Sequence, residues 1–167
     1  MKYILVIDQG TTSTRTIIFN EYAEVISMAQ KEISQSYPKP GWVYQDANEI
    51  WLSVLTTITE ALYKKNIDPK NIDVIGITNQ RETVVAWDKK TEKPLHEAIV
   101  WQSRQTQAFC NELKDSGHES MIKEKTGLII DPYFSATKMA WLLSHIDNVE
   151  TYIREKRLAF GTIDSFI

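Results

Sequence analysis

The sequence predicts an α/β fold, and three observations carry this prediction. Three short apolar segments follow one another over residues 3–33 with polar turns between them, which is typical of an antiparallel three-stranded meander. A helical repeat of apolar residues follows over residues 46–62. Short apolar runs then alternate with segments of helical spacing, which favours a mixed sheet with helices on both faces.

The meander begins with a hairpin whose predicted strands span residues 3–7 and 16–20, and a third strand is expected over residues 24–33. The hairpin tip, Asp8–Arg15, reads DQGTTSTR and holds one carboxylate, one glycine, four hydroxyls and one guanidinium. Gly10 lets the backbone approach a ligand closely, and turn amides and hydroxyls donate to phosphate oxygens. The tip therefore suits a phosphate and its metal.

Charge assigns different roles to the two ionic residues of the tip. Arg15 can add positive charge beside a phosphate. Asp8 would repel a phosphate directly, so we expect it to act through Mg²⁺ or its water shell. The tip is neither a Walker A loop nor a dinucleotide-binding fingerprint, because it lacks Gly-Lys-Ser/Thr and has a single glycine. An ordinary polar turn is the alternative, since the same residue types favour turns.

A loop and a long helix are expected next. Residues 35–43, QSYPKPGWV, contain two prolines and a glycine that forbid regular structure, and Trp42 is expected to plug the core. Asp46 is expected to cap the helix, with Glu49 completing a capping-box-like pair. The predicted apolar face of the helix consists of Ile50, Trp51, Val54, Leu55, Ile58, Ala61 and Leu62.

The apolar run 72–78 predicts a buried, central strand, with five polar residues at its carboxyl end over Asn79–Thr83. Open sheets place their ligands at such strand ends. Arg81 and Glu82 offer donors and acceptors together, which suits a small polyhydroxy ligand. A surface ion pair is the alternative for these two residues.

A looser cluster follows the next predicted strands, at residues 84–87 and 98–101. Trp101 and Tyr133 could supply an apolar wall for a ligand, with the phenol as a further donor, and core packing is the alternative for Trp101. Helices are expected over residues 105–114, 119–125 and 135–145. Cys110 is expected to be a small core residue. The histidines His96, His118 and His145 lack metal-ligand spacing.

Composition narrows the class of protein further. The 167 residues are 43% hydrophobic and 25% charged with a net charge of −3, which is ordinary for a globular protein and argues against a nucleic-acid surface. A single cysteine excludes an internal disulfide and fits a reducing compartment, and a cytoplasmic location is expected. The apolar end, LAFGTIDSFI over residues 158–167, suggests a chain cut inside a larger fold, or a terminal strand docked in a sheet.

Six segments in order resemble the N-terminal part of the glycerol kinases, which are carbohydrate kinases of the actin, Hsp70 and hexokinase superfamily. The segments are IDQGTTSTR (residues 7–15), YPKPGWV (37–43), GITNQRET (76–83), AIVWQSRQT (98–106), TGLIIDPYFSATK (126–138) and FGTIDSF (160–166). The first is shared widely among carbohydrate kinases, whereas ITNQRET, VWQ and IDPYF point to the glycerol member. The resemblance implies a ribonuclease-H-like (actin-like ATPase) domain.

The resemblance also implies an activity, ATP-dependent phosphorylation of glycerol to sn-glycerol 3-phosphate with Mg²⁺. It assigns Thr11, Thr12, Ser13 and Arg15 to the nucleotide phosphates and Asp8 to catalysis, placing Mg²⁺ through water. It assigns Arg81, Glu82 and Tyr133 to the glycerol hydroxyls and Trp101 to the carbon chain. Partners would be glycerol and ATP/ADP, in a homo-oligomer at full length.

The chain is shorter than the family it resembles. Residues 1–167 would form the N-terminal carbohydrate-kinase domain, incomplete and without the C-terminal ATPase domain, the catalytic base and the adenosine pocket. We therefore expect this chain alone to be inactive. A kinase for another small polyol or sugar is one alternative, a non-catalytic binding module a second, and an actin- or chaperone-like ATPase, which needs no polyol cluster, a third.

Overall fold

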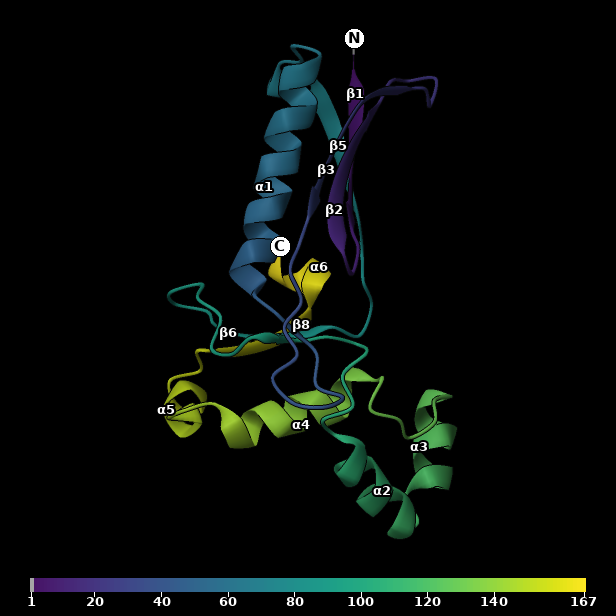
Figure 1. The fold of residues 1–167 in the computed structure, drawn as a ribbon, viewed down its shortest axis with the longest axis vertical. Coiled ribbons are helices and arrows are strands. Elements are labelled where there is room, and N and C mark those ends of the chain that lie inside the picture. Colours follow the sequence, from purple (N-terminus) through teal and green to yellow (C-terminus); the bar gives the residue numbers. More distant parts are fainter. Residues whose placement is uncertain (1) are drawn as a thin grey trace. The chain divides into compact units, whose positions relative to one another are not determined.

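The computed structural model describes residues 2–167, which form two compact units (Figure 1). Unit 1 comprises the chain up to Gln35 together with Gln45–Arg81 and Ile163–Ile167. Unit 2 comprises Ser36–Tyr44 and Glu82–Thr162. Each unit contains strands and helices, so the predicted α/β class is confirmed.

Unit 1 is built on a four-stranded mixed sheet with the order β3-β2-β1-β5. Its strands are β1 (Tyr3–Gln9), β2 (Ser13–Phe19), β3 (Val25–Glu32) and β5 (Ile72–Asn79). The first three pair antiparallel and form the predicted meander, while β5 runs parallel to β1. A 3-10 turn, η1 (Pro69–Asn71), leads into β5.

Helix α1 (Ala47–Lys64) lies along one face of this sheet (Figure 1) and buries its apolar residues against β1, β2 and β3. Asp46 caps the helix by accepting a hydrogen bond from the Asn48 amide at 2.8 Å. The predicted capping box does not form, because Glu49 accepts instead from the Ser34 amide and hydroxyl at 3.1 and 3.2 Å. Glu49 thus fastens the chain after β3 to the start of α1.

The contact between α1 and β2 contains buried hydroxyls as well as apolar side chains. Thr14 and Ser53 hydrogen-bond at 2.6 Å, and Thr16 and Thr57 at 2.8 Å. The prediction that Trp51 and Leu55 face the core is wrong, because both side chains are 41% exposed. The helix presents its Ser53 and Thr57 side to β2, where paired hydroxyls satisfy one another.

Strand β5 differs from its prediction. It lies at one edge of the four-stranded sheet rather than at its centre, and Val74, Ile75 and Ile77 are about half exposed, at 56%, 57% and 47%. No other strand among residues 2–167 pairs with its outer edge. The sheet face that bears Ile4, Met28 and Val74 is also open to solvent, so in this unit α1 covers one face only.

Unit 2 contains a second four-stranded sheet with the order β4-β7-β6-β8, except that Gln45 at the end of β4 belongs to unit 1. Its strands are β4 (Tyr44–Gln45), β7 (Ala98–Ile99), β6 (Val84–Asp88) and β8 (Leu158–Thr162), and β6 pairs antiparallel with both β7 and β8. The sequence pattern anticipated a single sheet. The helices of this unit are α2 (Gln107–Asp115), α3 (Glu119–Thr126), α4 (Ser135–His145) and α5 (Val149–Arg154), and α6 (Ile163–Phe166) belongs to unit 1.

Helix α4 packs on β6 around the buried residues Val84, Ala86 and Leu142. Trp42 packs against this core as predicted and meets Trp141 edge-to-face, with ring centroids 5.4 Å apart. Cys110 is buried, as predicted. The end residues 158–162 form β8, docked against β6.

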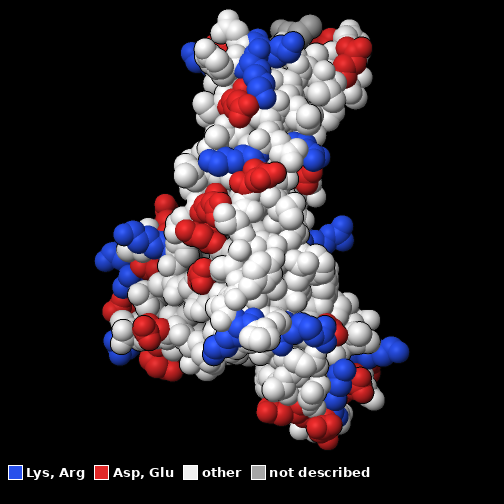
Figure 2. Space-filling model, in the orientation of Figure 1, with Lys and Arg blue, Asp and Glu red and all other residues white. Residues whose placement is uncertain are grey.

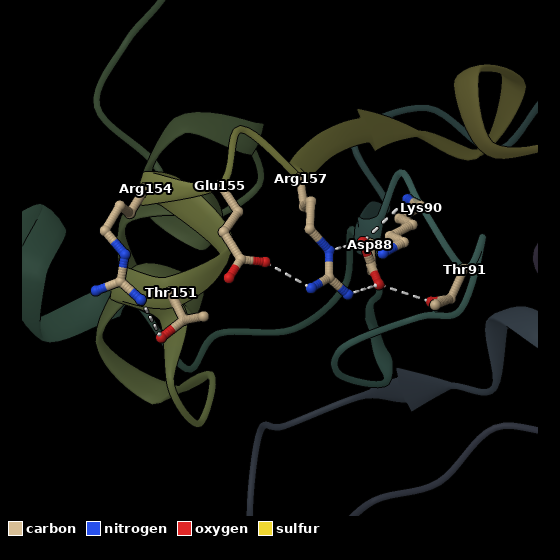
Figure 3. Close-up of polar contacts among 7 residues, drawn as sticks. All are labelled: Asp88, Lys90, Thr91, Thr151, Arg154, Glu155 and Arg157. Atoms are coloured by element: carbon tan, nitrogen blue, oxygen red, sulfur yellow. Dashed lines mark hydrogen bonds and ion pairs between the residues drawn. The ribbon is translucent and has the colours of Figure 1, made fainter.

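An ion-pair cluster fastens the end of β6 to the start of β8 (Figure 3). The Arg157 guanidinium donates from Nε to Asp88 at 2.9 Å and also from Nη2, while its Nη1 meets Glu155 at 2.8 Å. The Lys90 amide and the Thr91 hydroxyl complete the acceptor sites of Asp88. These hydrogen bonds, that of Arg157 above all, hold the pKa of Asp88 well below its usual range.

One face of the molecule carries charges of both signs (Figure 2). On the face drawn in Figure 2, Lys and Arg are interspersed with Asp and Glu rather than gathered into one basic field. Across residues 2–167, no helix has the length and apolar character that a membrane span requires.

Candidate functional site

The hairpin tip between β1 and β2 is a tight turn closed by its own backbone. The Gly10 amide donates to the Ser13 carbonyl at 2.9 Å, and a Cβ on Gly10 would lie only 3.2 Å from that oxygen. Thr12 is exposed and Thr11 and Ser13 are partly exposed, so all three can meet a ligand. The fourth hydroxyl, Thr14, is buried against Ser53 and serves the fold instead.

Three buried glutamines, which we call the glutamine triad, lie behind this tip: Gln9, Gln45 and Gln80. Gln45 donates to the Thr11 carbonyl and Gln9 to the Gly10 carbonyl, each at 2.7 Å. Gln80 donates to the side-chain oxygens of Gln45 at 2.8 Å and Gln9 at 3.2 Å. Two carbonyl oxygens of the tip, which would repel an anion, are thereby bound from inside the protein.

Sequence reasoning placed Gln80 in a polar cluster but did not find the triad. Gln9 and Gln80 each lie at the carboxyl end of an apolar run, and this position in the sequence indicates a residue near a ligand site. Gln45 has no local signal, because its two partners come from segments far away in the chain.

Asp8 and Arg15 face each other across the β1–β2 pair. Their charged atoms lie 3.6 Å apart, and Arg15 also donates from Nε to Gln30 at 3.2 Å. Both side chains are about two-fifths exposed, so a ligand can reach them. The register places them on the sheet face opposite the buried residues that meet α1.

Asp8 does not belong to a cluster of three or more potential metal ligands among the described residues. No group of three or more His, Cys, Asp or Glu side chains suited to a metal is found within residues 2–167. Mg²⁺ in phosphoryl-transfer sites is held by one or two carboxylates with waters and substrate phosphates. The half-exposed Asp8 beside the hairpin tip could be the carboxylate of such a site, with waters and substrate phosphates as the other ligands.

Two of the predicted polyol residues lie in the wall of one cavity of about 300 Å³ in unit 2, whereas Glu82 and Arg81 are not among its lining residues. Trp101 and Tyr133 line it, with ring centroids 5.9 Å apart in an edge-on arrangement. Trp101 is thus not simply a core residue. The remaining lining is supplied by Gln102, Ser103, Arg104, Asp131 and Pro132.

Glu82 is fixed to helix α4 of the same unit. Its carboxylate accepts a hydrogen bond from the Ser135 hydroxyl at 2.5 Å, and its carbonyl accepts from Lys138 at 2.8 Å. The ion pairs within residues 2–167 do not include Glu82, so this residue is not part of the alternative surface pair. Arg81 is exposed and belongs to unit 1, where it ends the segment Gln45–Arg81.

Lys138 is fully buried, and besides the Glu82 carbonyl its ammonium group also donates to the Tyr133 carbonyl. Burial lowers the pKa of Lys138 to about 8, although the negative charges of Glu82 and Asp131 oppose this shift. Sequence reasoning missed Ser135 and Lys138. Lys138 lies four residues before the core residue Leu142, and this spacing places both on the same, buried side of a helix.

By its fold, the chain is a carbohydrate-kinase domain of the actin-like ATPase type. A glycerol kinase of Plasmodium falciparum solved with ADP superposes with a TM-score of 0.91 at 32% identity, over 99% of this chain and 33% of that one. A gluconate kinase of Lactobacillus acidophilus, 22% identical, shares the fold with a TM-score of 0.85 over 99% of this chain and 32% of its own.

The sequence matches the description "FGGY family of carbohydrate kinases, N-terminal domain" over residues 3–167, and the chain belongs to this family. Glycerol kinases of Oceanobacillus iheyensis and Bacillus licheniformis are 57% and 56% identical over 166 residues, or 99% of this chain. The chain spans about a third of their length, 33% and 34%.

Proposed function

We propose that the chain is the N-terminal third of a cytoplasmic glycerol kinase that transfers the terminal phosphoryl group of ATP to glycerol, giving sn-glycerol 3-phosphate. The observation that carries the proposal is the identity of 54–57% to glycerol kinases along 99% of the chain. The cavity of unit 2 supports it, because an aromatic wall beside hydrogen-bonding side chains suits a short polyol.

Unit 1 would bind the nucleotide phosphates. Thr11, Thr12 and Ser13 would donate from their hydroxyls and backbone amides, and Arg15 would neutralise phosphate charge. Asp8 would hold Mg²⁺ through water, and the metal would neutralise charge on the transferring group. The glutamine triad would keep the tip preformed, so that little ordering is required on binding.

Unit 2 and Arg81 would bind the acceptor. Arg81, Glu82 and Tyr133 would hydrogen-bond the glycerol hydroxyls, and Trp101 would pack against the carbon chain. Glu82 can accept from a hydroxyl because its carboxylate has acceptor sites beyond the one that Ser135 occupies. Phosphoryl transfer needs mainly positioning and charge neutralisation, which these groups would supply.

The proposal includes a domain assignment. Residues 1–167 would form the N-terminal carbohydrate-kinase domain without the catalytic base and adenosine pocket, which would lie in the rest of a homo-oligomeric full-length enzyme. A kinase for another polyol or sugar is disfavoured by the combination of Arg81, Glu82, Trp101 and Tyr133.

A coupled assay with ATP and Mg²⁺ tests the proposal on this chain and on the full-length protein, over a panel of glycerol, other polyols and sugars. We expect the full-length protein to phosphorylate glycerol with the highest kcat/KM in the panel, and the 167-residue chain to be inactive. A higher kcat/KM for another acceptor would overturn the substrate assignment. Turnover by the chain alone would overturn the assignment of the base to the rest of the protein.

A further inference from the structure

Lys138 lies in the first turns of α4 with its side chain fully buried. Lysine is almost never fully buried unless its charge is paired or hydrogen-bonded, because removing an ammonium group from water is costly. Here Nζ donates to two backbone carbonyls, those of Glu82 and Tyr133. One buried charge therefore joins two residues to which the proposed function assigns the glycerol hydroxyls.

The backbone at Glu82 needs such support. Glu82 has a φ of +62°, in the left-handed region that residues other than glycine rarely adopt. A charge-assisted hydrogen bond from Lys138 to the Glu82 carbonyl stabilises this conformation. Ser135, one turn earlier on α4, holds the carboxylate of the same residue, so the start of α4 fixes Glu82 at both its carbonyl and its side chain.

Tyr133 is held by the same ammonium group. Its carbonyl accepts from Lys138, and Nζ lies 6.0 Å from the centroid of its ring. The ring in turn lies edge-on to Trp101 in the cavity wall. A displacement of Nζ would therefore move the Tyr133 phenol and its contact with Trp101 in the cavity wall.

We propose that Lys138 is a positioning residue for polyol binding, which fixes the Glu82 carboxylate and the Tyr133 phenol relative to each other through their backbone carbonyls. This inference rests on the proposed function. Lys138 itself would not touch the substrate, because its side chain is buried behind the residues that line the cavity. Loss of its positioning is therefore expected to weaken polyol binding rather than to remove a reacting group.

The charge of Lys138 gives the proposal a second consequence. The titratable groups that face Nζ are Glu82, Asp131 and Cys110, and burial outweighs their attraction and lowers the pKa of Lys138 to about 8. Above that pH the amine is neutral, and its hydrogen bonds to the two carbonyls lose their charge assistance. Polyol affinity should then fall as pH rises through 8.

The test is steady-state kinetics of the full-length protein with Lys138→Met, whose unbranched side chain is one heavy atom shorter and carries no charge. We expect the KM for glycerol to rise about tenfold or more, with KM for ATP within about twofold and kcat changed less than KM. Lys114→Met, at an exposed lysine near the end of α2, is the matched control and should change none of these values.

A KM for glycerol within about twofold of wild type, in a Lys138→Met protein with the wild-type circular dichroism spectrum, would overturn the inference. If Lys138→Met does not fold, the wild type decides: its KM for glycerol should rise between pH 7.5 and 9.5 around the pKa of about 8, with KM for ATP flat, and a flat glycerol profile refutes the proposal. A wild type that does not phosphorylate glycerol overturns the proposed function itself.

Discussion

Gln45 holds, through a side-chain hydrogen bond, a turn that it does not belong to, the hairpin tip that we propose binds phosphate. It is buried, donates to the Thr11 carbonyl and accepts from Gln80. Without it, the Thr11 carbonyl would lose a buried donor, and a carbonyl oxygen that turned outward would face the incoming phosphate. The tip depends on this amide because a turn of small polar residues has little packing of its own.

We predict that Gln45→Met, which has a similar size but no hydrogen-bonding amide, raises the KM for ATP of the full-length protein about tenfold. The glycerol KM should change less, because the polyol cavity belongs to unit 2. The free energy of unfolding should fall by about 1–3 kcal/mol, since buried partners lose their hydrogen bonds. Kinetics and urea unfolding measure the two effects.

Gln107→Met is the control for this prediction, because Gln107 bonds only to neighbours on or beside its own helix, Arg104 and Asn111. It should leave KM for ATP unchanged. An unchanged KM for ATP in a folded Gln45→Met protein would show that the triad does not shape the tip.

The residues that the sequence revealed and those it hid differ in a physical way. Asp8, Gly10 and Arg15 could be predicted because their chemistry is concentrated in one short segment. Gln45 and Ser135 act through hydrogen bonds to residues far away in the chain, and such pairs leave no local pattern. Lys138 is intermediate, because its helical spacing with Leu142 marks a charge on a buried face.

The position of helix α1 could be predicted from the sequence, but the side that it presents to the sheet could not. Its existence, its Asp46 cap and most of its buried residues follow from periodicity. Its rotation about its own axis does not, because Ser53 and Thr57 look polar in sequence and become core residues only when Thr14 and Thr16 of β2 lie opposite. Reciprocal hydroxyl bonds thus decide which side of the helix faces the sheet.

The ion pair between Asp88 and Arg157 is expected to stabilise the pairing of β6 with β8 (Figure 3). Asp88→Asn removes the charge that Arg157 binds, so we expect a lower melting temperature at pH 7, by several degrees. The pKa of Asp88 is depressed in the folded protein, so its stabilisation is fully present above the ordinary value of 3.8 and is lost progressively as pH falls from 3.8 through the lower folded pKa. The melting temperatures of wild type and variant should therefore converge in acid.

Thermal unfolding followed by circular dichroism from pH 7 down to strongly acidic pH, well below 3.8, measures this effect. Arg154→Ala is the control from the same segment, because Arg154 donates to the Thr151 hydroxyl at 3.5 Å and makes no hydrogen bond to Asp88 among the described residues (Figure 3). It should change the melting temperature little at any pH. Equal melting temperatures for Asp88→Asn and wild type at pH 7 would mean that the cluster does not stabilise unit 2.

The distribution of the proposed site residues between the two units could be predicted only in part. The order of motifs separates the proposed phosphate-binding tip from the proposed polyol-binding residues in sequence, and the tip lies in unit 1 whereas Glu82, Trp101 and Tyr133 lie in unit 2. The sequence did not indicate the two sheets or the edge position of β5. An apolar run predicts a buried strand equally well whether its neighbours are present or absent.

The edge position of β5 leads to a prediction about the chain as a molecule in solution. Val74 and Ile75 point to opposite faces of the sheet, and both are more than half exposed, next to an outer edge that no strand of residues 2–167 pairs with. Open edges and exposed apolar faces promote association. We expect the 167-residue chain to self-associate from micromolar to millimolar concentrations, as measured by sedimentation velocity.

Lysine substitutions at these positions separate β5 from the rest of the surface. Val74→Lys together with Ile75→Lys should reduce association, because a charge on each side of an edge strand opposes pairing with another chain. Ile129→Lys, at an equally exposed apolar residue of unit 2, should leave association unchanged. A chain that stays monomeric throughout, or a double variant that associates like wild type, would show that β5 is not the contact. Association that depends on β5 would instead identify this strand as the surface of unit 1 that requires a covering partner.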